Sequence, residues 1–353
     1  MINLPEKYRF HDSFKDIESI SCPLIFGLTE NIPNPFFSVV IPTYGRPEYL
    51  VQAISSILKQ EDFDLPFEIV VVDNEASTDP NGTEKLLREL NLPNLLYYRN
   101  SENIGGAGNW NRCIAKARSQ WVIMCHDDDM LKPSCLRIMA QIVEKHKKDK
   151  LPLGYVRSSA EPLYEGNIQR AVFTGSHNRM KKKEDAVVKM DFVNVILTGG
   201  ATWSGAPTCG TLINKQAIMA VGGYNKELTP CFDCYVPFSM IGKYGVFKTY
   251  YSLGIYRWGQ NDTYRKSTIL NLIRAYNEFL EILSKEYLFV KLFSNEHYAD
   301  CVNYYSKKAE EGKVVLSSDE IGDIRPLCFS KTKLNLILQL RKAFSFWSQL
   351  IAK

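Results

Sequence analysis

Short apolar runs alternate with segments of helical period in the first half of the chain, between Phe36 and about Lys147. The runs lie at residues 37–41, 67–72, 95–98 and 121–125. Between the first two runs, four apolar residues recur at i, i+4, i+7 and i+8 and line one helix face, namely Leu50, Ile54, Ile57 and Leu58. This alternation predicts βαβ units around a parallel sheet. Unbroken apolarity in 69–72 and 122–124 predicts strands that helices cover on both faces, as in a doubly wound sheet.

The pattern is weaker after residue 150 and changes character toward the C-terminus. We expect a helix over 185–197, a strand over 208–213 and a helix over 215–221 that two glycines end. From Thr268 onward the pattern is helical, apart from an interruption near 312–326. Before Phe36, four prolines predict an irregular stretch. The chain is therefore divided into an irregular N-terminal extension over 1–35, an α/β domain over 36–262 and a helical C-terminal region over 263–353.

Composition and charge narrow the classes of function. The 353 residues carry 43 Lys and Arg against 39 Asp and Glu, a net charge of +4 that is too small and scattered for a protein that binds a phosphate backbone. Nucleic acid is therefore not expected as a partner. The sequence has no membrane span and no signal peptide pattern, so we expect a cytoplasmic protein. The nine cysteines are expected to be free thiols in that compartment. Cys231 and Cys234 form a single CxxC motif, and the sequence offers no further pair of ligands at the spacing that a zinc site needs.

Polar residues follow three of the four predicted strands, at the edge where sheets of this kind bind ligands. They are Pro42 to Pro47 after the first strand, Asp73 and Asn74 after the second, and His126 to Asp129 after the fourth. The three consecutive carboxylates repel one another, and a hard divalent cation that also binds ligand phosphates would compensate for this repulsion. The alternative is a solvated acidic turn that caps a helix beginning near Pro133.

Four strings in register point to one family. They are FSVVIPTYGRPEYL, FEIVVVDNEASTD, NIGGAGNWNRCIAKARSQWVIMCHDDDMLKP and GGYNKELTPCFD. Together they resemble the inverting glycosyltransferases of family 2, from about Phe36 to Trp258. The resemblance implies a GT-A fold, that is, a doubly wound, mostly parallel sheet flanked by helices, here with a helical C-terminal appendage. It also implies transfer of a sugar from a nucleotide-sugar, with a UDP-sugar as the expected donor, to a saccharide or lipid-linked acceptor in cell-surface polysaccharide synthesis.

The resemblance assigns roles to the residues at the strand ends. Asp128 matches the final Asp of the family's DxD motif and would bind Mn²⁺ or Mg²⁺ on the sugar diphosphate. The residues expected to bind the nucleotide are Pro42, Thr43, Tyr44, Arg46, Asp73 and Asp127. For Asp73 the alternative is an Asx-turn with Ser77 and Thr78 nearby.

Three positions depart from the family pattern around the nucleotide and the metal. His126 replaces the first Asp of the DxD motif, and Trp110 stands where many members have an arginine that contacts the nucleotide. The family's His after the last strand is absent, because Tyr256 and Arg257 are followed by Trp258. Arg257 is therefore expected to approach the diphosphate or the acceptor, or simply to pair with a carboxylate.

Asp233 is the expected catalytic base. Family members carry an ED pair about eight to twelve residues after a glycine-rich turn, and the counterparts here are Phe232 and Asp233 after Gly222 and Gly223. In a single displacement, one carboxylate must reach the acceptor hydroxyl that attacks the anomeric carbon. The alternative is that Asp233 caps a helix beginning at Cys234.

Two further functions remain open at this point. The protein could keep the nucleotide-sugar pocket without turnover, since His126 and the missing Glu before Asp233 depart from the family. It could also be a nucleotidyltransferase on a related sheet, although the segment after the first strand matches poorly. A dinucleotide site at 105–108 is disfavoured, because this glycine run follows the third strand and has the wrong spacing.

The C-terminal segment 331–353 is basic and amphipathic. It contains five basic residues and no acidic residue, a local charge of +5. Its apolar residues share one helical face and are Leu336, Ile337, Leu340, Ala343, Phe344, Trp347, Leu350 and Ile351. This face could pack on its own domain, form a helix pair in a homodimer, or lie on an anionic membrane as a peripheral contact.

Overall fold

The computed structural model describes residues 10–77, 79–164, 187–190, 193, 208–258 and 265–351. The described residues belong to two compact units. The first, which we call the sheet unit, comprises residues 10–162 and 205–256. The second, which we call the helical unit, contains residues 257–353 together with 163–204 and 1–9.

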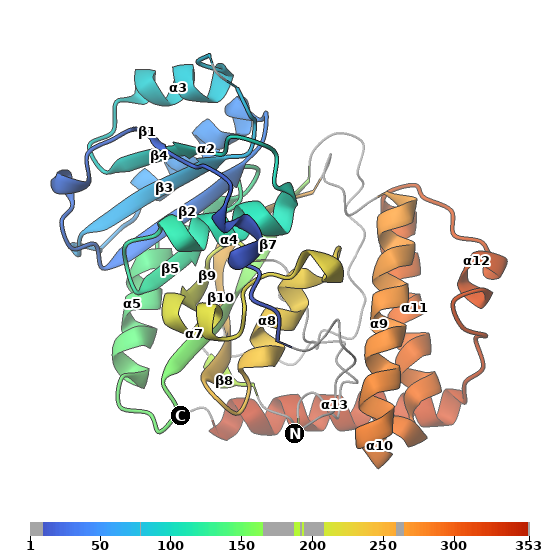
Figure 1. Ribbon diagram of the computed structural model, residues 1–353. Helices are drawn as coiled ribbons and strands as arrows, with labels where there is room; N and C mark the ends of the chain where they lie inside the picture. The colour runs from blue at the N-terminus through green and yellow to red at the C-terminus, as the bar shows by residue number, and fades with distance from the viewer. Residues whose placement is uncertain are drawn as a thin grey trace. The chain divides into compact units, whose positions relative to one another are not determined.

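A twisted mixed sheet organises the sheet unit, in the strand order β1-β4-β3-β2-β5-β9-β7-β10-β6 (Figure 1). Strands β4, β3, β2 and β5 are parallel neighbours, and β9 and β1 join them in the antiparallel direction. The strand bounds are β1 Leu24–Phe26, β2 Phe37–Thr43, β3 Phe67–Asp73, β4 Leu95–Arg99, β5 Trp121–Met124, β6 Met130–Leu131, β7 Leu153–Tyr164, β9 Thr211–Asn214 and β10 Gly245–Trp258. The predicted parallel core and its four strands are thus confirmed.

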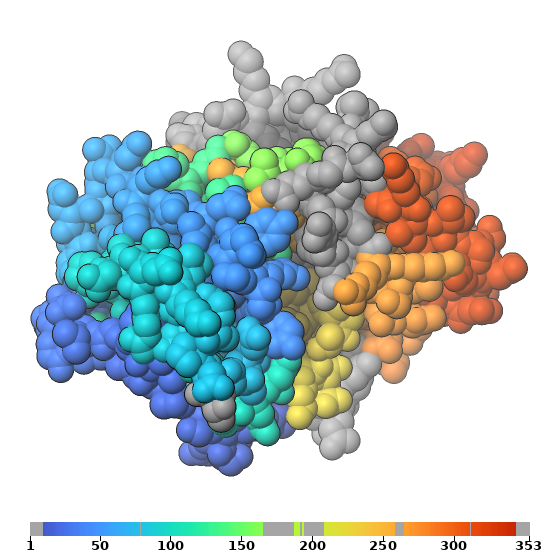
Figure 2. All heavy atoms as spheres, turned by 90° about the horizontal axis from the view of Figure 1, so that it is seen from above, coloured from blue at the N-terminus to red at the C-terminus, as the bar shows by residue number. Residues whose placement is uncertain are grey.

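Helices flank this sheet on both faces. Figure 1 shows α4 in front of the central strands and α2 behind them, and the cyan side chains that include α3 form part of the face shown in Figure 2. The helices of this unit are α1 Lys15–Glu18, α2 Pro47–Leu58, α3 Gly82–Leu90, α4 Gly105–Lys116, α5 Cys135–His146, α7 Lys215–Ala220 and α8 Phe232–Met240, with short 3₁₀ turns η2 Thr29–Asn31 and η4 Lys226–Leu228. Leu50, Ile54 and Ile57 of α2 are buried as predicted. The two-sided cover explains why β3 and β5 are apolar without alternation.

The helical unit contains the short strand β8 Val187–Lys189 and the C-terminal helices. The helices are α9 Lys266–Glu286, α10 Leu288–Leu292, α11 Ser294–Glu311, α12 Ser318–Gly322 and α13 Lys331–Ile351. Helix α11 contacts both α9 and α13. Among the described residues, no helix is both long and apolar enough to cross a membrane.

Two segments differ from the sequence-based expectation. The stretch before Phe36, expected to be irregular, contains α1 and β1, and Leu24 of β1 pairs with Tyr98 of β4. Within the helix expected over 185–197, Val187–Lys189 is a strand, and most of the other residues lie outside the described ranges. Both strands have three residues, too few to show a period in the sequence.

A buried ion pair holds the amino ends of the central strands and the N-terminal segment together. Glu68 of β3 is fully buried, and its Oε2 accepts a hydrogen bond of 2.6 Å from Nε of Arg118. The guanidinium of Arg118 also donates to the backbone carbonyls of Thr29 and Ile32, at 3.0 and 2.7 Å. The Arg118 side chain therefore pairs with Oε2 of the buried carboxylate and fixes the segment that leads into β2, while the Ser38 hydroxyl donates to Oε1.

We predict that Glu68→Ala lowers the free energy of unfolding by about 3 kcal/mol, because it leaves the Arg118 guanidinium without its buried counter-charge. Urea unfolding followed by circular dichroism measures this. Glu89→Ala, which removes an exposed carboxylate from α3, is the control and should change stability by less than about 0.5 kcal/mol. Equal unfolding midpoints for the two variants would contradict a stabilising role for the pair.

Candidate functional site

Three strand ends bring the predicted site residues to one edge of the sheet. Thr43 at the end of β2 is in register with Asp73 at the end of β3, and β5 runs parallel to β2 on its other side before the acidic turn that starts at His126. Thr43 Oγ1 donates to Asp127 Oδ2 at 2.8 Å, and the backbone N–H of Tyr44 lies 3.4 Å from the same oxygen. Strand β2 and the turn after β5 are thus joined by a side-chain hydrogen bond as well as by the pairing of β2 with β5.

Asp127 is held inward by these contacts. Burial and the neighbouring Asp128 raise its pKa to about 6, against the opposing effects of the Thr43 hydroxyl and the Arg46 guanidinium. The Tyr44 side chain, in contrast, is 57% exposed at the strand end, and Pro42 is buried within β2. An exposed aromatic ring beside an oriented carboxylate can contact a flat ring and a hydroxyl group of one ligand.

The acidic turn contains a group of side chains that could hold a metal ion. One ligand atom from each of His126, Asp128 and Asp129 lies within 4.8 Å of the others. His126 Nδ1 is 3.6 Å from Asp129 Oδ2, and His126 Nε2 is 2.9 Å from Thr208 Oγ1. Burial lowers the pKa of His126, which favours the neutral imidazole that ligates metals. With Nε2–H donating to Thr208, Nδ1 would present its lone pair to a cation, so the donor set fits Mn²⁺ or Mg²⁺.

Sequence reasoning did not identify Asp129 and His126 as candidate metal ligands. The resemblance drew attention to Asp128 and made His126 a departure, whereas Asp129 was considered as a helix cap. The structure instead starts α5 at Cys135, with Ser134 as its N-cap, and turns the chain at Asp129 through a backbone bond from its N–H to the carbonyl of His126. That tight turn places His126, Asp128 and Asp129 close together. Their spacing of i, i+2 and i+3 in a turn is the sequence signal that could have indicated all three as candidate ligands.

Arg46 lies against the same carboxylates. Its Nη1 is 2.8 Å from Asp128 Oδ2 and 3.8 Å from Asp127 Oδ1, and its side chain is 40% exposed. The guanidinium therefore compensates the charge of the acidic turn in this state of the protein. A divalent cation on Asp128 Oδ2 would be close to a like charge unless Arg46 moved away.

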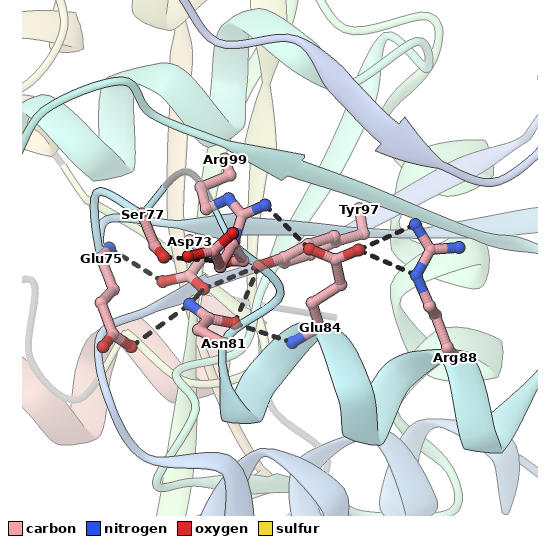
Figure 3. Close-up of polar contacts among 9 residues, drawn as sticks. Asp73, Glu75, Ser77, Asn81, Glu84, Arg88, Tyr97 and Arg99 are labelled. Carbon is pink, nitrogen blue, oxygen red and sulfur yellow. Dashed lines mark hydrogen bonds and ion pairs between the residues drawn. The ribbon is translucent and has the colours of Figure 1, made fainter.

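Asp73 lies inside a hydrogen-bonded network rather than at the surface (Figure 3). Its Oδ1 accepts from the backbone N–H of Glu75 at 2.9 Å, and its Oδ2 accepts from Tyr97 Oη and Asn81 Nδ2, each at 2.8 Å. The bond to Glu75 has the spacing of the Asx-turn left open above, while Thr78 lies outside the described residues. A nucleotide contact by Asp73 remains a prediction.

The same network shapes the loop that follows β3. Burial and the Asp73 carboxylate raise the pKa of Tyr97, so its hydroxyl stays a donor. Asn81 Oδ1 in turn caps α3 by accepting from the backbone N–H of Glu84, and Glu84 forms a buried ion pair of 2.8 Å with Arg99 (Figure 3). Asp73 thus links the end of β3 to β4 and to the N-cap of α3.

An asparagine on α4 clamps the glycine-rich turn that precedes the predicted base. Asn111 Nδ2 donates to the carbonyl of Tyr224, and the N–H of Tyr224 donates to Asn111 Oδ1, both at 2.8 Å. Gly223 has a φ of +77°, and a Cβ there would lie 2.5 Å from Asn111 Oδ1. Only glycine therefore allows this close approach. The clamp joins residues far apart in the sequence, and no local pattern indicated it.

Trp110 connects this turn with the acidic turn. Its ring centroid is 4.4 Å from that of His126, 5.1 Å from that of Tyr224 and 4.9 Å from that of Phe232. The contacts with Tyr224 and Phe232 are edge-to-face, the geometry that aromatic quadrupoles prefer. Trp110 therefore packs between the possible metal ligands and the segment that carries Asp233.

Asp233 lies in the first turn of α8. The helix begins at Phe232 and its N-cap is Cys231, so Asp233 lies inside the helix. The alternative that Asp233 is the N-cap of a helix beginning at Cys234 is therefore wrong. Asp233 Oδ1 accepts from the Cys234 thiol at 3.5 Å, and burial raises the pKa of the carboxyl against the effects of Cys234 and Arg157. A carboxylate with a raised pKa is suited to take a proton near neutral pH. The free thiols of Cys231 and Cys234 are not part of the metal-binding group found among the described residues.

Arg257 belongs to the end of β10 and is buried. The contacts of the chain assign it to the helical unit, whereas the other predicted site residues belong to the sheet unit. Its approach to a diphosphate or an acceptor remains a prediction.

Comparison with known proteins agrees with these observations. Residues 38–200 match the family model Glycosyl transferase family 2. The abequosyltransferase RfbV of Salmonella typhimurium is 39% identical over 106 residues, which are 29% of this chain and 31% of that protein. The GalNAc(5)-diNAcBac-PP-undecaprenol beta-1,3-glucosyltransferase of Campylobacter jejuni is 27% identical over 286 residues, covering 79% of this chain and 84% of that one.

A solved structure shows the same fold. The crystal structure of Staphylococcus aureus TarS 1–349 in complex with UDP superposes with a TM-score of 0.52 at 17% identity, covering 89% of this chain and 88% of that chain. The alignments with several curated relatives span only 20–41% of those relatives' lengths.

We predict that Arg46→Ala increases the affinity of the protein for Mn²⁺ alone by about fivefold, the size expected on removing a partly exposed ion pair that competes for Asp128. Electron paramagnetic resonance of free Mn²⁺ measures this at low ionic strength. Arg88→Ala, which removes a half-exposed arginine that pairs with Glu84 on α3, away from the acidic turn, is the control and should leave the affinity unchanged. An unchanged or weakened affinity in Arg46→Ala would show that Arg46 does not compete with the cation.

Proposed function

Because the chain belongs to glycosyltransferase family 2 and has the GT-A fold, we propose that it is an inverting, metal-dependent glycosyltransferase that uses a nucleotide-sugar. The observation that carries this proposal is the convergence of Thr43, Arg46 and the acidic turn at one sheet edge, with the carboxylate of Asp233 on α8 in the same compact unit. We assign the transferase domain to residues 36–262, which contain every proposed site residue, and treat 263–353 as an accessory helical region.

The donor is proposed to be a UDP-sugar. The TarS structure with the same fold contains UDP, and the strand-end segment here offers groups that suit a nucleoside diphosphate. Tyr44 presents its exposed ring to the base, and Asp127, held by Thr43, presents its carboxylate to a ribose hydroxyl. Pro42 and Asp73 are proposed to shape the base pocket from β2 and β3. Arg46, once released from Asp128, can reach the diphosphate.

The metal site is proposed to consist of His126, Asp128 and Asp129. When bound there, Mn²⁺ or Mg²⁺ would offset the charge that develops on the departing nucleoside diphosphate. Thr208 contacts Nε2 of His126 and so fixes the orientation of the ring. Metal-ligating histidines are commonly oriented by a hydrogen bond of this kind on their other ring nitrogen.

Asp233 is proposed as the catalytic base. Its carboxylate would accept the proton of the acceptor hydroxyl while that oxygen attacks the anomeric carbon from the face opposite the nucleotide. One displacement of this kind inverts the anomeric configuration. Two contacts hold the segment before Asp233 in place, namely the hydrogen bonds between Asn111 and Tyr224 and the packing of Trp110 on Phe232. Proton transfer needs a correctly oriented carboxylate, and these contacts would help to orient that of Asp233.

The acceptor is proposed to be a saccharide, and in particular a lipid-linked one. The Campylobacter jejuni relative, which aligns over most of both chains, is named for a glucosyl transfer to an undecaprenol-linked saccharide. A role in building a cell-surface polysaccharide follows from such an acceptor. Arg257 is proposed to contact the diphosphate or the acceptor, on the ground of its position at the end of the last strand, β10.

We predict that UDP raises the melting temperature and that Mn²⁺ or Mg²⁺ enlarges the shift, because a ligand at about 100 times its Kd stabilises a protein by about 2.7 kcal/mol. Asp128→Ala should abolish the metal-dependent part of the shift, since it removes a ligand atom but leaves the fold intact. Thermal shift assays check both. Asp64→Ala, an exposed loop carboxylate, is the control and should behave like the parent protein. A full metal response in Asp128→Ala would place the metal elsewhere.

We predict that Asp233→Asn lowers turnover by about 10² or more while UDP binding persists, because an amide cannot accept the proton. Release of free nucleoside diphosphate in the presence of acceptor measures turnover and also separates a transferase from a protein that only binds the nucleotide-sugar. The rate should fall as pH decreases through the raised pKa of Asp233, since only the ionised carboxylate is a base. The variant should lack this acid limb, and near-normal turnover in it would move the base to another residue.

A further inference from the structure

The carboxylate at the end of β3 is fully engaged inside the protein. Asp73 is fully buried, and both of its oxygens accept hydrogen bonds from the protein. Tyr97 and Asn81 donate to Oδ2 at 2.8 Å each, and the backbone N–H of Glu75 donates to Oδ1 at 2.9 Å. Asp73 therefore serves as an internal scaffold, and a ligand at this strand end meets the residues that the scaffold holds in place.

Glu75 is the carboxylate that this scaffold carries to the surface. Its side chain is partly exposed, and its Oε2 lies 3.3 Å from Nδ2 of Asn81, the same nitrogen that donates to Asp73. Figure 3 shows Glu75 at one end of the network and Arg88 at the other. In the part of the chain that the structure describes, no group donates a hydrogen bond to Glu75 Oε1. One oxygen of an oriented carboxylate is thus left for a donor on a ligand.

The sheet register places Glu75 near the exposed ring of Tyr44. Thr43 and Asp73 are level in the paired strands β2 and β3, and the next N–H along β3, that of Asn74, donates to the carbonyl of Thr43 at 3.0 Å. Tyr44 and Glu75 follow directly on these two strands, whose axes are about 4.8 Å apart. The ring of Tyr44, 57% exposed, and the carboxylate of Glu75 therefore belong to the same part of the sheet edge.

The strand order matches the order of the parts of a nucleoside diphosphate. Strands β5, β2 and β3 are consecutive in the sheet. The proposed metal ligands follow β5, Asp127 is held at the end of β2 by Thr43, and Glu75 follows β3. A nucleotide that binds the metal through its phosphates and Asp127 through its ribose extends its base toward the end of β3, since three adjacent strands span about 10 Å. The carboxylate of Glu75 then faces the base rather than the phosphates, whose negative charge would repel it.

We propose that Glu75 is a specificity-determining residue for the nucleobase, whose Oε1 accepts the ring N–H of a uracil that stacks on Tyr44. An ionised carboxylate only accepts hydrogen bonds. It therefore accepts the N3–H of uracil, whereas it is repelled by the lone pair that cytosine carries at N3. This inference rests on the proposed function, because it assigns the base contact within the same donor site.

The test compares the affinities for UDP and CDP, which share the ribose and the diphosphate and differ only in the base. Isothermal titration calorimetry in the presence of Mn²⁺ measures both. The parent should bind UDP at least about tenfold more tightly than CDP, the factor expected for a hydrogen bond to a charged group. Glu75→Gln should reduce this ratio by about tenfold, because a neutral amide accepts more weakly and can itself donate to N3 of cytosine.

The matched control is Glu89→Gln, the same substitution at an exposed position of α3 in the sheet unit. It should keep the parent's ratio of affinities. Both variants should melt with the parent in the absence of nucleotide, so that a changed ratio reports the base contact and not the fold. The inference is overturned if Glu75→Gln keeps the parent's ratio, or if it lowers the affinities for UDP and CDP by the same factor.

The same titrations keep the inference and the proposed function apart. A parent that binds UDP and CDP equally well overturns the selection of the base and leaves the proposed function in place. An unchanged ratio in Glu75→Gln, with UDP binding intact, does the same. A parent that binds no nucleoside diphosphate overturns the proposed function, and the base contact with it.

Discussion

The three consecutive carboxylates at the end of β5 are the constraint around which the site is arranged. Side by side at a largely buried strand end, they would repel one another strongly. The chain separates them by giving each a different partner. Asp127 turns to Thr43 and the backbone of Tyr44, Asp128 pairs with Arg46, and Asp129 faces His126. The end of β2 therefore exists in its present form partly because it neutralises the turn after β5.

With the proposed metal site, this arrangement would couple the cation and the nucleotide. Arg46 pairs with Asp128, so a cation that binds the same carboxylate oxygen would compete with the guanidinium. A released Arg46 carries its positive charge at the edge where a diphosphate would bind. If the cation increases the affinity for the diphosphate through Arg46, the diphosphate increases the affinity for the cation by the same factor. Cooperative binding of metal and donor would then follow from one side chain.

The sequence predicted the parts of the structure that depend on local periodicity. Residues 37–41 and 67–72 became β2 and β3, and the helix face with Leu50 and Ile54 is buried as expected. The motifs also placed Thr43, Arg46 and the acidic turn near one another, because parallel strands end at the same sheet edge. What lay beyond prediction was the choice of partners within that edge, such as Asp73 turning to Tyr97 and Asn81.

Three of the four departures from the family pattern prove to be neighbours in space, the exception being the absent His after Arg257. His126 stands for an aspartate, Trp110 for an arginine and Phe232 for a glutamate, and the ring of Trp110 contacts both of the others. An arginine at 110 would place a charge beside the imidazole of His126, and a glutamate at 232 would have to be desolvated against the same cluster. Here the charges have been replaced together by aromatic packing with Tyr224. Restoring any one charged residue alone would set it against the aromatic rings of this cluster, so the three positions are best understood as one coupled change.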